Sequence, residues 1–198
     1  IVNRVDVDLS LNKALALAEI FERLNLKATF FVRLHAPEYN PLSFENYRII
    51  KGLHEQGFEI GYHSEIIDLQ TIWNEDAEVC LKRDLKFFEN YFGIKIEGVA
   101  SHGGMTGLNN LDFWNDKKPE SYGLSYEGYD QEPSFNLFNN SLYISDSEWT
   151  QWKSYSDGKL NLDDKRSLGE HLDDNPRLIY LTIHTDTYFH NHFYEKEL

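Results

Sequence analysis

The order of hydrophobic segments constrains this chain more than any other feature. Over its first two-thirds, apolar segments typical of strands alternate with amphipathic segments typical of helices. We expect strands at 2–8, 27–32, 58–63 and 94–101, and helices at 11–25, 44–56 and 75–92. Parallel strands need long connections, usually helices. The alternation therefore favours an α/β fold with a parallel sheet and helical crossovers.

Local signals define the helix expected at 44–56. Ser43 is suited to cap the helix that follows it, and Gly57 to end it. The apolar spacing predicts that Phe44, Tyr47 and Ile50 face inward.

The pattern loosens after Gly103, where Asn, Asp, Gly and Tyr become frequent. Short strands are expected at 123–127, 142–146 and 178–184. We find no repeat, low-complexity tract or linker in the sequence. The chain is therefore predicted to be one domain, 1–198, built as a parallel α/β barrel or barrel-like sheet.

Composition excludes several classes of partner. The 198 residues are 41% hydrophobic, which is typical of a folded globular protein, and carry a net charge of −14 with no basic stripe. We expect no nucleic-acid partner and no membrane span, because no apolar run reaches about 18 residues. Cys80 is the only cysteine and is expected to be a buried helix residue. A cytoplasmic location is expected, and the oligomeric state is not predicted.

Potential metal ligands and acid–base groups stand at the ends of predicted strands. In parallel α/β folds the active site lies at the carboxyl ends of the strands. The residues at these ends are Asp6 and Asp8, His63, His102, Asp146 and His184. We therefore expect a catalytic site there.

The two aspartates lie on one face of the first strand, because successive side chains of a strand point to opposite faces. One carboxylate can bind a metal while the other acts as a base. Two imidazoles and a carboxylate suit Zn²⁺ with an open position for water. The alternative is structural: Arg4 lies on the same face and can pair with either carboxylate.

Four segments together resemble the polysaccharide deacetylases, the NodB-homology proteins of carbohydrate esterase family 4. They read "RVDVD", "KATFFV", "GFEIGYHSE" and "LTIH", and the resemblance is strongest over 2–68 and returns at 178–184. It implies a distorted (β/α) barrel with fewer than eight parallel strands. It also implies metal-dependent removal of an N- or O-acyl group, usually acetyl, from a saccharide or glycan precursor. The metal it implies is most often Zn²⁺.

The resemblance also implies roles by position. Asp6 resembles the general base and Asp8 the metal-binding aspartate. His63 resembles the first histidine ligand, and His184 the general acid.

The sequence departs from the family pattern in two places. Ile67 stands where the second histidine ligand is expected, and the usual Arg-x-Pro segment is replaced by "ASHGGMTG". Some family members of surface-glycan biosynthesis are similar in this region. We expect His102 to replace the missing ligand, with Glu65 and Asp68 as alternatives.

Aromatic residues near these positions are candidates for a sugar-binding platform. They are Tyr62, Trp149, Trp152 and Tyr188. Asp186 lies two residues after His184 and is a candidate to orient it. His190 and His192 form a weaker alternative metal site.

Two other functions stay open at this point. The first is a catalytically degenerate family member that binds glycan or serves as a scaffold, which Ile67 and the missing Arg-x-Pro favour. The second is an amidohydrolase acting on a small non-sugar amide.

Overall fold

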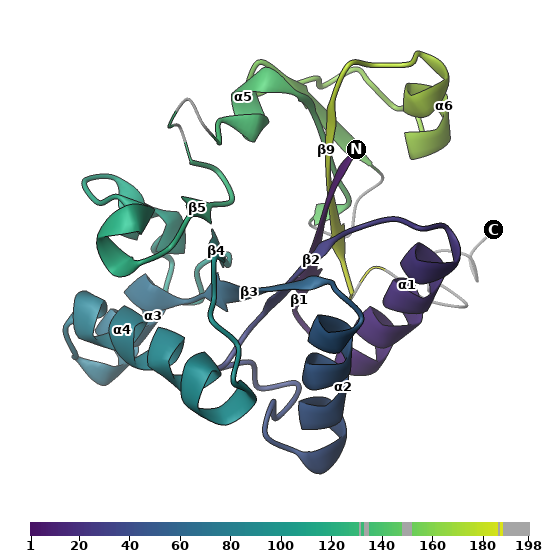
Figure 1. Ribbon diagram of the computed structural model, residues 1–198. Helices are drawn as coiled ribbons and strands as arrows, with labels where there is room; N and C mark the ends of the chain where they lie inside the picture. The colour runs from purple at the N-terminus through teal and green to yellow at the C-terminus, as the bar shows by residue number, and fades with distance from the viewer. Residues whose placement is uncertain (131, 133–134, 148–151, 186, 188–198) are drawn as a thin grey trace, which may run out of the picture. The chain divides into compact units, whose positions relative to one another are not determined.

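The chain has a mixed α/β fold. The computed structural model describes residues 1–130, 132, 135–147, 152–185 and 187 (Figure 1). The chain divides into two compact units, one made of Ile1–Thr29 with Tyr129–Leu198 and the other of Phe30–Gly128. None of the helices in the described part of the chain has the length and apolar character that a membrane-crossing segment requires.

Five strands of the first unit are hydrogen-bonded in the order β1-β9-β6-β7-β8. They are β1 (Val2–Val7), β9 (Ile179–His184), β6 (Leu142–Ser145), β7 (Lys153–Ser156) and β8 (Lys159–Leu160). The β1–β9 and β9–β6 pairs are parallel, and β9 runs alongside β1 in Figure 1. The β6–β7 and β7–β8 pairs are antiparallel and were not expected from the sequence.

Helix α1 (Leu11–Arg23) begins where the sequence predicts, because the Ser10 side chain accepts a hydrogen bond from the Lys13 backbone N–H. Two shorter helices belong to the same unit, α5 (Leu137–Asn140) and α6 (Leu168–Asp173). Helix α6 starts with a capping box.

The strands of the second unit are hydrogen-bonded in the order β5-β4-β3-β2, and the β3–β4 and β4–β5 pairs are parallel. They are β2 (Thr29–Val32), which crosses the division between the units, β3 (Glu59–Ser64), β4 (Gly98–Ser101) and β5 (Tyr126–Glu127). Gly61 leaves room for the Phe31 ring, since a Cβ at Gly61 would lie 2.4 Å from Phe31 Cδ1.

The helices of the second unit are α2 (Phe44–Glu55), α3 (Ile66–Trp73) and α4 (Ala77–Phe87). A π-helical turn, η1 (Phe88–Phe92), follows α4, and the 3₁₀ turns η2 (Asn110–Trp114) and η3 (Pro119–Tyr122) lie after β4. Helix α3 packs against α4 (Figure 1) and begins just past His63, where the resemblance implies the start of a helix.

Helix α2 buries a different face from the predicted one. Phe44 is 88% exposed and Tyr47 is also exposed, whereas Ile49, Ile50 and Leu53 are buried. The inward prediction was therefore wrong for Phe44 and Tyr47 and confirmed for Ile50. Cys80 is confirmed as a buried residue of α4.

The barrel expected from the resemblance is not shown. Strand β8 ends the strand series of the first unit and β5 ends that of the second, so neither series closes among the described residues. The confirmed part of the fold prediction is the mixed α/β architecture with helices between parallel strands.

Candidate active site

Asp6 lies near the end of β1 and is 1% exposed. Arg4, on the same face of the strand, donates from Nε to Oδ1 and from Nη2 to Oδ2 of Asp6, both at 2.8 Å. Burial opposes the charge of Arg4, but the Asp6 carboxylate outweighs it and holds the pKa of Arg4 well above its ordinary value. This two-point contact fixes the orientation of the Asp6 carboxylate.

His184 ends β9, directly opposite Asp6 in the parallel β1–β9 pair. Its Nε2 lies 3.6 Å from Oδ2 of Asp6. On the other side of the ring, its Nδ1 lies 2.7 Å from Oδ1 of Asp146, the residue that follows β6. The His184 imidazole is therefore placed between two carboxylates.

Asp146 also fixes the backbone around His184. The His184 backbone N–H donates to Oδ1 and Oδ2 of Asp146, at 3.0 and 3.1 Å. The Thr187 hydroxyl donates to the same carboxylate and to the His184 carbonyl. Asp146 therefore holds the His184 backbone as well as its ring.

These neighbours favour the protonated ring of His184. Burial lowers its pKa, but the hydrogen bond to Asp146 and the charges of Asp6, Asp146 and Asp8 outweigh burial and raise the pKa to about 9. His184 is thus an imidazolium at neutral pH, which is the form that can donate a proton.

Sequence reasoning found Asp146 as a strand-end group but did not pair it with His184. The two lie 38 positions apart, and only the neighbouring positions of β6 and β9 bring them together. Asp186, the expected partner of His184, lies outside the described residues.

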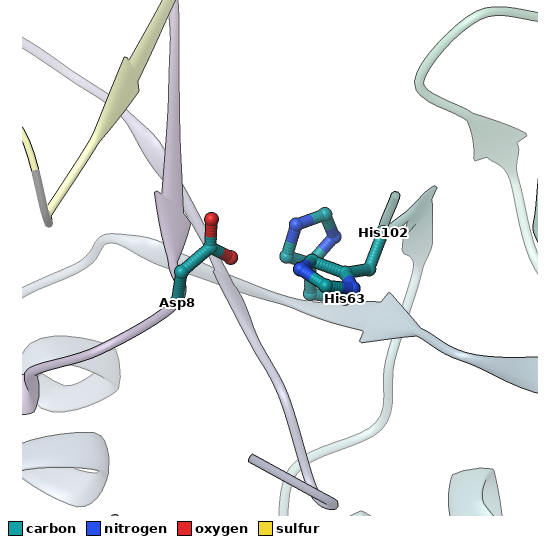
Figure 2. A group of neighbouring side chains, drawn as sticks. All are labelled: Asp8, His63 and His102. Atoms are coloured by element: carbon teal, nitrogen blue, oxygen red, sulfur yellow. The ribbon is translucent and has the colours of Figure 1, made fainter. Parts of the chain in front are cut away.

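Two histidines gather at the carboxyl ends of β3 and β4. His63 belongs to β3, and His102 directly follows β4 and donates its backbone N–H to the Ser64 carbonyl. The two rings lie near each other (Figure 2), edge to face, with their centroids 5.1 Å apart. Parallel pairing of neighbouring strands thus brings together two side chains that are 39 positions apart in the sequence.

The tautomer of His63 suits a metal ligand. Its Nδ1 lies 2.8 Å from the Ala100 carbonyl, which can only accept a hydrogen bond, so Nδ1 carries the proton. In the neutral ring Nε2 is then the lone-pair nitrogen, and a carbonyl partner of this kind is common for metal-binding histidines. His102 has Oε1 of the buried Glu65 at 3.7 Å from its Nδ1. These two rings therefore fit a metal that prefers nitrogen ligands.

Asp8 lies one residue after β1, at the carboxyl end of that strand (Figure 2), and is half-buried.

The two alternatives for the missing ligand are Asp68 and Glu65. Asp68 points its carboxylate at the backbone of Met105 and Thr106. Glu65 forms a buried ion pair with Arg33, 2.6 Å between Oε1 and Nη2. Both carboxylates therefore have protein partners in the second unit.

Tyr62 is not a sugar platform. It is 0% exposed, donates its hydroxyl to Asp84 and packs against Phe88, so its ring has no surface for a ligand. Its prediction as a substrate-binding residue is therefore corrected. Trp152 is half-buried and packs against the cluster of Ile144, Ile179 and Leu181.

Four other sequence predictions fall outside the described residues. They concern Trp149, Tyr188, His190 and His192. His171 is 1% exposed in α6, with Nε2 3.5 Å from Oδ2 of Asp164.

Comparison with solved structures identifies the fold. The polysaccharide deacetylase Bc1974 from Bacillus cereus has a TM-score of 0.53 at 16% identity, with 94% of this chain and 80% of that chain covered. BA3943, a CE4 family pseudoenzyme from Bacillus anthracis, has a TM-score of 0.51 at 14% identity, and the match covers 94% of this chain and 56% of BA3943. A BA3943 mutant with restored enzymatic activity has a TM-score of 0.51 at 13% identity, and the match covers 94% of this chain and 58% of the mutant.

The fold is thus that of the polysaccharide deacetylases, as the sequence motifs predict. The chain spans 80% of the Bacillus cereus protein but little more than half of BA3943. No protein-family model matches the sequence, and no curated protein matches it.

Proposed function

We propose that this protein is a metal-dependent hydrolase that removes an N- or O-acyl group, in the first instance acetyl, from a saccharide or glycan precursor. The observation that carries the proposal is the placement of His184 between Asp146 and Asp6 at the ends of parallel strands, which favours its protonated form. A glycan-binding module would gain nothing from a buried imidazolium beside a second carboxylate. The shared fold agrees with this activity.

The proposed metal ligands are Asp8, His63 and His102. They offer one carboxylate oxygen and two imidazole nitrogens, a donor set that could hold a divalent ion such as Zn²⁺. The His63 tautomer supports this assignment, because its Nδ1–H is directed at Ala100. A divalent ion bound there would polarise the acyl carbonyl and acidify a water molecule.

The protein's own groups would then move two protons. Asp6, oriented by Arg4, accepts a proton from the attacking water. His184 gives its proton to the departing nitrogen or oxygen of the sugar, while Asp146 stabilises the imidazolium before transfer. Both residues lie in one parallel strand pair, so their separation is set by the β1–β9 register.

The experiment that tests this proposal combines metal content with product release. The purified chain is stripped with a chelator, reloaded with Zn²⁺, and assayed for acetate release from acetylated saccharides and from small acetamides. We expect metal-dependent release from the saccharides. The variant His102→Ala should lose metal affinity, whereas His54→Ala, an exposed histidine of α2, should retain it.

The second candidate is a catalytically degenerate glycan-binding protein. Ile67 in place of a ligand favours it, and so does the likeness to BA3943, a pseudoenzyme. A metal-loaded chain that binds acetylated glycan without releasing acetate would establish this alternative. Release from small acetamides alone would instead indicate a non-sugar amidohydrolase.

A further inference from the structure

A buried carboxylate in the first turn of α3 holds the loop that carries His102. Asp68 is 2% exposed and accepts the backbone N–H of Met105, at 3.0–3.1 Å from its two oxygens. It also accepts the backbone N–H of Thr106 at 2.9 Å and the Thr106 hydroxyl at 2.7 Å. These bonds fix the middle of the loop formed by residues 103–109.

Asn110 completes the same network at the end of the loop. It is 0% exposed, and its Oδ1 accepts the backbone N–H of Asp68 at 3.0 Å. Its Nδ2 donates to Oδ2 of Asp68 at 2.8 Å and to the His102 carbonyl at 3.1 Å. Asp68 and Asn110 together therefore bind the His102 backbone as well as the middle of the loop.

The loop depends on this support because most of it faces solvent. Residues 103–105 and 107–109 are exposed. Gly104 approaches the Leu108 carbonyl so closely that a Cβ would lie 1.5 Å from its oxygen, and Gly107 has a φ of +84°. The glycines let the loop adopt this path, and the side chains of Asp68 and Asn110 fasten it to α3.

The donors also keep Asp68 charged. Burial alone would raise its pKa, but the hydrogen bonds from Met105, Asn110 and Thr106 lower it below the ordinary value. Charge-assisted bonds of this kind are roughly twice as strong as neutral ones.

We propose that Asp68 is a positioning residue that, through Asn110 and the loop 103–109, holds His102 where it can bind the metal. This inference rests on the proposed function, in which His102 is a ligand. Outer partners that orient a ligand typically contribute 10- to 100-fold to metal affinity. The Asp68 carboxylate bonds Met105, Thr106 and Asn110 and neither the His63 nor the His102 ring, so its effect must pass through the loop.

The test compares Asp68→Asn with a matched control, Asp84→Asn. Asp84 is a buried carboxylate of the same unit that accepts from Tyr62 and contacts His35, and neither partner belongs to the loop 103–109. In the metal-free protein, hydrogen exchange of the Met105 and Thr106 amides should accelerate in Asp68→Asn alone. In a competition titration with a chromophoric chelator, Zn²⁺ affinity should fall about 10- to 100-fold in Asp68→Asn and stay within about threefold in Asp84→Asn.

A milder variant, Thr106→Val, keeps the test valid if Asp68→Asn does not fold. It removes only the hydroxyl bond to Asp68, and we expect a several-fold loss of Zn²⁺ affinity.

A spectrum gives a second readout of the same role. The visible spectrum of the Co²⁺-loaded protein should change in Asp68→Asn but not in Asp84→Asn, because it reports ligand geometry.

The two proposals fail in different ways. If the wild-type chain binds Zn²⁺, His102→Ala abolishes binding and Asp68→Asn binds as tightly as wild type, the positioning role is overturned and the proposed function stands. If the wild-type chain binds no Zn²⁺, or His102→Ala does not weaken binding, the proposed metal site is overturned together with this inference.

Discussion

His184 and Asp146 are joined twice: the carboxylate contacts the imidazole Nδ1 at 2.7 Å and accepts the backbone N–H of the same residue. The contact fixes the ring, and it also raises the pKa of His184 to about 9 together with the Asp6 charge. A general acid must hold its proton at the working pH. Under the proposed function, this pair would therefore set the basic side of the pH profile of activity.

The first prediction concerns Asp146→Asn. Losing the carboxylate should bring the pKa of His184 down toward its ordinary value of about 6.5. The basic limb of the kcat/KM profile should then move to lower pH by more than one unit. Thr187→Val removes the hydroxyl bonds to Asp146 and to the His184 carbonyl but keeps the Asp146 carboxylate, so it should leave that limb nearly in place. An unmoved limb in Asp146→Asn would show that Asp146 does not control the acid.

The second prediction is a pH dependence of stability in the metal-free protein. The pKa of His184 is higher in the folded chain than in the unfolded chain, so the folded state holds the proton more tightly. The resulting stabilisation is complete below pH about 6.5 and is lost as the pH rises through about 9. Urea unfolding with EDTA present should show a loss on the order of 3 kcal/mol over this window.

His184→Asn isolates that contribution, because it cannot titrate between pH 6.5 and 9. Its free energy of unfolding should change less over the window than that of the wild type. Parallel curves for the two proteins would mean that the His184 proton does not stabilise the fold.

The third prediction separates the two aspartates at the end of β1. Asp6→Asn should keep the metal and lose turnover by about 10²–10⁴-fold, the usual contribution of a general base. Asp8→Asn should lose metal affinity. Elemental analysis of both purified variants distinguishes the roles, and equal metal loss in both would refute the division of labour.

Asp6→Asn should also be less stable than wild type, because it leaves the Arg4 charge buried without its carboxylate partner. Breaking a buried pair in this way costs about 3–5 kcal/mol. Metal and turnover measurements therefore need a temperature at which circular dichroism shows the variant to be folded.

The fourth prediction tests His184 as the acid. His184→Ala should slow release from substrates with poor leaving groups, such as an N-acetyl sugar, far more than from a nitrophenyl ester. An activated leaving group needs little protonation. A uniform loss over both substrate types would exclude His184 from the acid role.

Local sequence pattern determined much of the fold. The two-residue period of "RVDVD" predicts a strand with Arg4 and Asp6 on one face, and the structure shows them paired there. Ser10 and Ser43 mark helix starts correctly, because an N-cap acts over only three residues. The strand-end positions of His63, His102 and His184 follow from the same short-range signals.

Only the tertiary structure decided which of these residues have partners and which are buried. The Asp146–His184 contact spans 38 positions and depends on the β6–β9 pairing, which no local pattern specifies. Asp68 likewise bonds residues that lie 37 to 42 positions away, Met105 and Asn110 among them. The complete burial of Tyr62 also depends on how α3, α4 and the strands pack. Local periodicity predicts elements and faces, whereas hydrogen-bond partners are fixed by contacts between segments that are distant in the sequence.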